Sequence, residues 1–140
     1  MQSAAEFLRE RGIRPSVQRT AVYAYLRDHM THPTAEEIYL ALAPEFATLS
    51  RATVYNTLRL FAEKGAAKLI TIEEKEMRFD SLTTIHGHFK CVRCGCIEDF
   101  PIDEAAVRRQ LPAGDAAEEF HFYVRGTCAR CRAENPQKAC

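Results

Sequence analysis

Residues 50–80, SRATVYNTLRLFAEKGAAKLITIEEKEMRFD, give the clearest indication of the architecture. Ser50 is a residue type that caps helix N-termini, and Gly65 is typical of the position just beyond a helix C-terminus. The apolar residues between them recur at helical spacing, which predicts one buried face: Val54, Leu58 and Phe61. The next segment, 68–80, has two β-prone runs around the charged letters EEK, which predicts a hairpin.

Shorter helices are predicted upstream of this stretch. The first is an amphipathic segment from Ser3 that Gly12 closes, and the second follows the capping residue Ser16. The third carries a capping box, with Thr34 at the cap and Glu37 three positions later. Several short helices followed by a hairpin is the order of a winged helix-turn-helix.

The composition changes near residues 79–84, because every cysteine lies beyond this point. We therefore predict two domains, 1–80 and 81–140. The second alternates strand-like runs with one helix, DEAAVRRQL, and has a strand over EEFHFYVRG before the last cysteines. The predicted class is α+β, with an N-terminal winged helix-turn-helix DNA-binding domain followed by a small α/β domain that contains a structural zinc site.

Bulk composition restricts the kind of protein. The chain has 140 residues, of which 46% are hydrophobic and 27% charged, and this predicts a packed globular core. No stretch approaches the roughly 20 apolar residues that span a bilayer. The N-terminal segment MQSAAEFLRERGIRP lacks the apolar part of a secretion signal, so we expect a cytoplasmic protein. The formal net charge is zero, so a nucleic-acid partner requires a local basic patch.

The cysteines form two C-x-x-C pairs, Cys91 with Cys94 and Cys128 with Cys131. In a reducing compartment, paired cysteines hold metal more often than they form disulfides. Four thiolates complete the tetrahedron that Zn²⁺ accepts and leave no open position, which predicts a structural site. Redox disulfides and unrelated buried thiols are the alternatives. Two further cysteines fall outside the pattern: Cys96 and Cys140.

Histidines and carboxylates surround the first cysteine pair. His86 and His88 are two residues apart, so on a strand their side chains point to the same side. Asp80 precedes them, Asp99 follows them, and His32 stands before the third predicted helix. Each has an ordinary alternative role, since a histidine before a helix often caps it and an aspartate after a strand is usually solvated. Together, imidazoles and carboxylates suit Fe²⁺, Mn²⁺ or Zn²⁺.

The order of these motifs resembles the ferric uptake regulator family. The matching strings are HPTAEEIY, SRATVYNTLRLFAEKG, RFD, H-x-H, C-x-x-C-G…DF and a terminal C-x-x-C, over residues 5–131. The resemblance implies a homodimeric, metal-dependent repressor whose second domain is the dimerisation domain. It also implies one regulatory site for Fe²⁺ or Mn²⁺ with ligands from both domains: His32, Asp80, His86, His88 and Asp99.

The last ligand separates the branches of the family. Peroxide-sensing members resemble this chain in having an aspartate at the position of Asp99, whereas iron-uptake members usually have a glutamate. Glu98 is adjacent, and strand neighbours point to opposite faces, so only one of the two can be a ligand. We predict a peroxide sensor in which bound iron promotes oxidation of His32 or His86 and the operator is released, while Mn²⁺ supports binding without this chemistry. An iron- or zinc-uptake regulator is the alternative.

The helix SRATVYNTLRLF is expected to enter the major groove of a palindromic double-stranded operator. Seven residues are expected to contact DNA: Arg51 and Tyr55 on bases and phosphates, Thr53, Asn56 and Arg59 in support, and Arg14 and Arg19 on backbone phosphates. A metallohydrolase is the remote alternative, but the chain has no H-E-x-x-H motif and we do not expect an enzyme. A zinc-ribbon interaction module is disfavoured by the helix-then-hairpin order.

Overall fold

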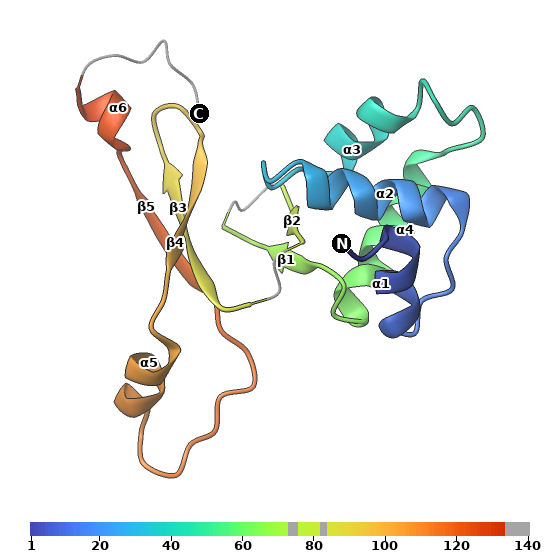
Figure 1. Ribbon diagram of the computed structural model, residues 1–140. Coiled ribbons are helices and arrows are strands. Elements are labelled where there is room, and N and C mark those ends of the chain that lie inside the picture. Colours follow the sequence, from blue (N-terminus) through green and yellow to red (C-terminus); the bar gives the residue numbers. More distant parts are fainter. Residues whose placement is uncertain (73–75, 82–83, 134–140) are drawn as a thin grey trace. The chain divides into compact units, whose positions relative to one another are not determined.

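The computed structural model describes residues 1–72, 76–81 and 84–133. The chain forms two compact units, Met1–Thr83 and Thr84–Cys140 (Figure 1). Each unit has its own cluster of buried residues. The combination of helices with small sheets confirms the predicted α+β class. No helix in the described ranges is long and apolar enough to span a lipid bilayer.

Helices dominate the first unit, and side-chain caps determine where they begin. They are α1 (Ala4–Glu10), α2 (Val17–Asp28), α3 (Ala35–Leu42) and α4 (Arg51–Glu63). The predicted caps Ser16, Thr34 and Ser50 each accept a hydrogen bond from the backbone N–H three positions on, and Ser3 does the same for α1. Just beyond α4, Gly65 has a φ of 71°, a conformation that glycine adopts without strain.

The apolar faces of these helices meet in one hydrophobic cluster. From α4 come Val54, Leu58 and Phe61, all fully buried, as the helical spacing predicts. The Phe61 ring meets the Tyr23 ring edge-on at a centroid distance of 6.1 Å, and Tyr23 stacks on Phe7 at 4.5 Å. Because one face of α4 is used in this core, its polar face is left to solvent.

A hairpin completes the first unit. Its antiparallel strands are β1 (Lys68–Ile70) and β2 (Arg78–Asp80). The predicted turn EEK, residues 73–75, lies outside the described residues. The Phe79 N–H donates to the Pro33 carbonyl at 3.0 Å, which attaches β2 to the segment before α3. This attachment brings Asp80, at the end of β2, beside His32.

A three-stranded sheet forms the body of the second unit. Its strands are β3 (His86–Cys91), β4 (Ile97–Pro101) and β5 (Phe122–Gly126), and helices α5 (Glu104–Gln110) and α6 (Ala129–Arg132) lie at opposite ends of the sheet (Figure 1). The central strand β3 pairs antiparallel with β4 and parallel with β5. The strand predicted over EEFHFYVRG is shorter than expected, because its pairing with β3 starts at the Gly87–Phe122 position.

The register of β3 explains why a glycine stands between the two histidines. Gly87 faces Phe100 in the neighbouring strand β4, and a Cβ atom added at Gly87 would overlap the Phe100 ring. Glycine therefore lets Phe100 cover one face of β3, while His86 and His88 occupy the other.

Replacing Leu58 by alanine is expected to lower the free energy of unfolding by about 2–5 kcal/mol, because the side chain is fully buried in the first core. The matched control is Leu40→Ala on α3. Leu40 is 58% exposed, so its loss should change stability by no more than about 0.5 kcal/mol. Urea unfolding followed by circular dichroism measures both variants, and equal effects would contradict the assigned core.

Candidate metal centres and nucleic-acid interface

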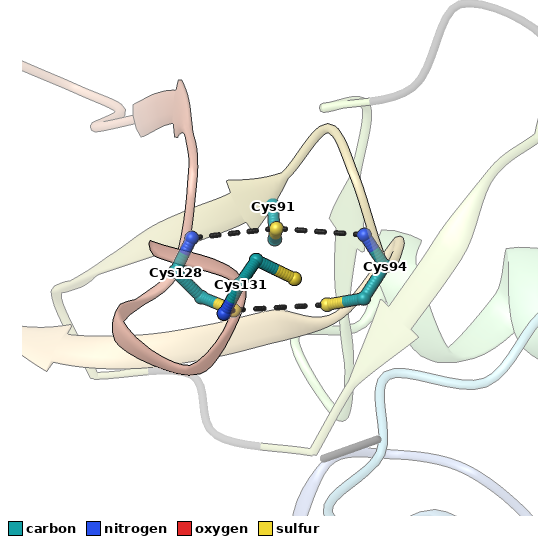
Figure 2. Close-up of side chains that lie close together, drawn as sticks. All are labelled: Cys91, Cys94, Cys128 and Cys131. Carbon is teal, nitrogen blue, oxygen red and sulfur yellow. Dashed lines mark hydrogen bonds between the residues drawn. The ribbon is translucent and has the colours of Figure 1, made fainter. Parts of the chain in front are cut away.

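Four cysteine thiols converge in the second unit. Their sulfur atoms all lie within 4.8 Å of one another, and they belong to the end of β3, the turn after it and the start of α6: Cys91, Cys94, Cys128 and Cys131. Figure 2 shows the side chains pointing toward a common centre from two separate segments. All but the exposed Cys94 are buried. The structure thus brings together both predicted C-x-x-C pairs.

Tight turns direct each pair of thiols inward. The Cys91 N–H donates to the Cys96 carbonyl at 2.9 Å, and the Gly95 N–H donates to the Cys91 carbonyl at 2.9 Å. Gly95 has the positive φ, 77°, that this turn requires. On the other side, Cys128 caps α6 and its sulfur accepts the N–H of Cys131 at 3.5 Å.

Backbone N–H groups stabilise a thiolate at Cys91. The N–H groups of Cys128 and Cys94 lie 3.3 Å and 3.5 Å from its sulfur, and they lower the pKa of Cys91 to about 6. Burial, together with the neighbouring thiols, raises the pKa of Cys131 to about 12. Near neutral pH the group therefore combines a thiolate with a proton that a metal ion would displace. Four sulfur donors fit a closed tetrahedral metal site.

Cys96 lies next to this group without belonging to it. Its side chain packs against the buried thiols, and the Nη2 atom of Arg130 lies 4.0 Å from its sulfur. Cys140 lies outside the described residues.

A second group of donors gathers at the start of β3. The Nε2 atoms of His86 and His88 are 3.0 Å apart, and Oδ1 of Asp99 lies 3.7 Å and 3.4 Å from them. Nδ1 of His86 lies 2.7 Å from the Thr84 carbonyl, so this nitrogen carries the proton and Nε2 turns a lone pair toward the group. Two imidazoles and a carboxylate that face one point are suitable ligands for Fe²⁺, Mn²⁺ or Zn²⁺.

Strand alternation separates Asp99 from Glu98. Asp99 is opposite His88 in the pairing of β3 with β4, and its carboxylate lies on the histidine face. Glu98 points the other way, and its Oε1 lies 3.7 Å from Nη2 of Arg130. The aspartate, and not the glutamate, is therefore the carboxylate beside the histidines.

The first unit holds the remaining predicted donors as a buried pair. Nε2 of His32 lies 3.6 Å from Oδ2 of Asp80, and the two side chains are 4% and 3% exposed. His32 has a φ of 54°, which is uncommon for a residue other than glycine and is typical of functional positions. The Arg78 guanidinium donates to the His32 carbonyl at 3.1 Å and holds this conformation. The predicted ligands thus form a pair in one unit and a group of three in the other.

The remaining histidines make local contacts. His29 follows α2 as its C-cap, and its Nδ1 lies 3.1 Å from the Tyr25 carbonyl. His121 lies 3.1 Å from the Tyr123 hydroxyl and 3.1 Å from a Glu119 carboxylate oxygen.

The polar face of α4 adjoins a hollow of about 440 Å³ at the start of α2. The residues that line it are Ser16, Gln18, Arg19, Thr53, Asn56 and Thr57. Arg14 is exposed nearby, and its carbonyl accepts a hydrogen bond from Nη1 of Arg19 at 2.9 Å. Tyr55 and Arg59 are exposed on the same helix. Sequence reasoning missed Thr57, which is only 5% exposed; a polar residue among the apolar positions of α4 was the available signal.

Arg51, the first residue of α4, does not line the hollow but contacts α3. Its guanidinium binds the Glu36 carboxylate and lies over the Tyr39 ring. The hydrogen bond lowers the pKa of Glu36 and raises the pKa of Arg51. Sequence reasoning missed both partners, since no spacing rule links residues of different helices.

A winged-helix unit followed by a unit with thiol and imidazole donors defines a class of metal-binding regulators. The chain belongs to the ferric uptake regulator family, whose family model matches residues 10–121. It is 45% identical over 135 residues to the peroxide-responsive repressor PerR of Staphylococcus aureus (strain Mu50), covering 94% of this chain and 91% of that protein.

Two further comparisons agree with this assignment. The chain is 39% identical over 134 residues to the peroxide operon regulator of Bacillus subtilis (strain 168), covering 94% of this chain and 92% of that protein. The crystal structure of the ferric uptake regulator of Vibrio cholerae matches with a TM-score of 0.71 at 25% identity, over 89% of this chain and 98% of that one. These matches confirm the predicted family. Because the relatives are transcriptional regulators, they also agree with the prediction that the protein is not an enzyme.

Replacing Cys131 by serine is expected to abolish metal retention at the four-thiol group and to lower the thermal midpoint of the protein, because a metal ion bound there would contribute to folding of the second unit. Elemental analysis of the purified protein and a melting curve measure the two effects. The control for metal content is Cys96→Ser, because Cys96 lies outside the group and its replacement should leave the metal bound. Full metal content in the Cys131 variant would show that the thiols do not act together.

Proposed function

We propose that this chain is a metal-dependent homodimeric repressor that releases its operator when hydrogen peroxide oxidises a ligand histidine. The observation that carries the proposal is the group of His86, His88 and Asp99 in a member of the ferric uptake regulator family. The similarity to the peroxide-responsive repressor of Staphylococcus aureus and the peroxide operon regulator of Bacillus subtilis supports peroxide as the signal.

Two groups of donors would hold one regulatory ion, Fe²⁺ or Mn²⁺. Two histidines and one carboxylate from the second unit are a ligand set that leaves open positions on Fe²⁺. His32 and Asp80 of the first unit are a histidine and a carboxylate that can fill such positions. An ion bound by all five donors would fix the angle between the two units, and this would couple metal binding to DNA binding.

The chain orients the rings that the reaction needs. Bound Fe²⁺ would supply the electron that activates hydrogen peroxide next to the ligand rings, whereas Mn²⁺ would occupy the same donors without this chemistry. The Thr84 carbonyl turns Nε2 of His86 toward the donors, and Arg78 fixes the backbone of His32. An oxygen atom added to either imidazole would remove a good ligand and loosen the site.

The four-thiol group would hold a structural Zn²⁺ through Cys91, Cys94, Cys128 and Cys131. Because four thiolates leave no open coordination position, this ion would take no part in the reaction with peroxide. Its role would be to join the end of β3 to α6.

The polar face of α4 would enter the major groove of a palindromic operator, with one half-site for each subunit of the dimer. The side chains on or beside this face are those expected to contact DNA: Arg51, Thr53, Tyr55, Asn56 and Arg59. The hollow at the start of α2 would accept a backbone phosphate, because Arg19 supplies a positive charge and the helix N-terminus attracts anions. Arg14 would contact the same strand.

Brief exposure of the iron-loaded protein to micromolar peroxide is expected to add one oxygen atom to His32 or His86. Peptide mass spectrometry measures the modification, and a gel shift with operator DNA measures the loss of binding. His29 and His121 serve as internal controls, since their contacts are local and they should remain unmodified. The manganese-loaded protein should keep both its histidines and its DNA binding.

Unmodified histidines with intact DNA binding would instead favour an iron- or zinc-uptake regulator, because the same donors also suit Zn²⁺. Turnover of a substrate that required the histidine group would revive the metallohydrolase alternative.

Replacing Arg19 by alanine is expected to weaken binding to every duplex and to reduce the slope of log affinity against log salt by about 1, because one phosphate contact is lost. The duplexes are those that the manganese-loaded protein enriches from a randomised library. The matched control is Arg109→Ala, an exposed arginine on α5 of the second unit. An unchanged salt slope in the Arg19 variant would exclude the hollow as a phosphate site.

A further inference from the structure

The first residue of the recognition helix is held in place before any DNA is bound. Nε of Arg51 donates to Oε2 of Glu36 at 2.9 Å and to Oε1 at 3.2 Å, and Nη2 donates to Oε1 at 3.0 Å. Glu36 belongs to α3 and Arg51 to α4, so the contact joins two helices. The carboxylate accepts hydrogen bonds along one edge of the guanidinium group, in a bidentate contact.

Tyr39 restricts the same guanidinium from a second direction. The central carbon of the Arg51 guanidinium lies 4.4 Å from the centroid of the Tyr39 ring. Tyr39 is one turn along α3 from Glu36, so a single helix supplies both the carboxylate and the aromatic face. Arg51 is nevertheless 63% exposed, which means that it is fixed in orientation while it stays accessible to a ligand.

The contact with Glu36 leaves one edge of the guanidinium available. Arginine has five N–H donors, and Glu36 uses the edge formed by Nε and Nη2. Within the described ranges no protein acceptor engages Nη1, so the edge formed by Nη1 and the second N–H of Nη2 faces solvent. Two parallel donors at this spacing match O6 and N7 of guanine in the major groove.

We propose that Glu36 is a positioning residue that fixes Arg51 to read one guanine in each half of the operator. This inference rests on the proposed function, because it assumes that α4 enters the major groove. A negative charge close to DNA opposes binding in general, so Glu36 would weaken contact with arbitrary sequences while it preserves the contact with guanine. The pair would therefore contribute selectivity rather than overall affinity.

The test selects duplexes from a randomised library with the manganese-loaded full-length protein and its variants Arg51→Ala and Glu36→Gln. Arg51→Ala should lose the preference for guanine at one position of each half-site by about tenfold or more, the value expected for one bidentate contact. Glu36→Gln should lower that same preference by several fold, while binding to the best duplex changes little. The preferences at other positions should remain.

The chain contains a matched control for the glutamate substitution. Nε and Nη2 of Arg108 on α5 donate to Oε1 of Glu104 at 3.0 Å and 2.8 Å, and the guanidinium lies 4.9 Å from the Phe120 ring centroid. The second unit therefore also has an arginine held between a glutamate and an aromatic ring, although here the glutamate lies on the same helix and uses one oxygen. Glu104→Gln should alter no base preference. Melting curves of all variants ensure that altered selection does not reflect unfolding.

The outcomes separate this inference from the function on which it rests. Tighter binding of Glu36→Gln to all duplexes, with every preference unchanged, would make Glu36 a competitor of DNA and overturn the inference alone. Unchanged base preferences in Arg51→Ala would likewise overturn the inference and leave the proposed repressor function standing. If the wild-type protein enriches no sequence, the proposed repressor function fails and the inference fails with it.

Discussion

One strand of six residues, β3, determines the second unit because it carries donors at both ends. His86 and His88 stand at its start and Cys91 at its end. As the central strand it sets the register of both neighbours, and the β4 register brings Asp99 to the histidines. The thiols join the end of β3 to the helix that follows β5. A metal held there would keep the sheet in the register on which the histidine group depends.

Buried ionisable side chains connect the stability of this protein with its ligands. The side chain of His88 is 1% exposed, and those of His32 and Asp80 are 4% and 3% exposed. Burial of imidazoles and carboxylates costs free energy that apolar residues would not. A metal ion that binds only the folded chain offsets this cost and stabilises the fold by mass action. If these residues hold the ion, as proposed, they also make the folded state responsive to its concentration.

Rules that involve only neighbouring residues predicted part of this structure from its sequence, and they could not predict the rest. The helix starts at Ser16, Thr34 and Ser50 and the convergence of the thiols could be predicted, because capping and C-x-x-C spacing are properties of a few neighbouring residues. Two other features could not be predicted from the sequence: the parallel pairing of β3 with β5, and the contact between Arg51 and Glu36. Both join segments that only tertiary packing brings together, and side-chain spacing along the chain contains no information on them.

The division of the proposed ligands between two units limits what a metal ion can do. A ligand shifts an equilibrium only through its different affinity for the two states, and a change from 1:99 to 99:1 needs a difference of about 10⁴-fold. In one state only the second unit would bind the ion, through His86, His88 and Asp99. In the other state His32 and Asp80 of the first unit would bind the ion as well. Loss of His32 would therefore reduce the difference between the affinities of the two states for the ion. Loss of His86 weakens both states together, so the two histidines are not equivalent as sensors even though both are proposed ligands.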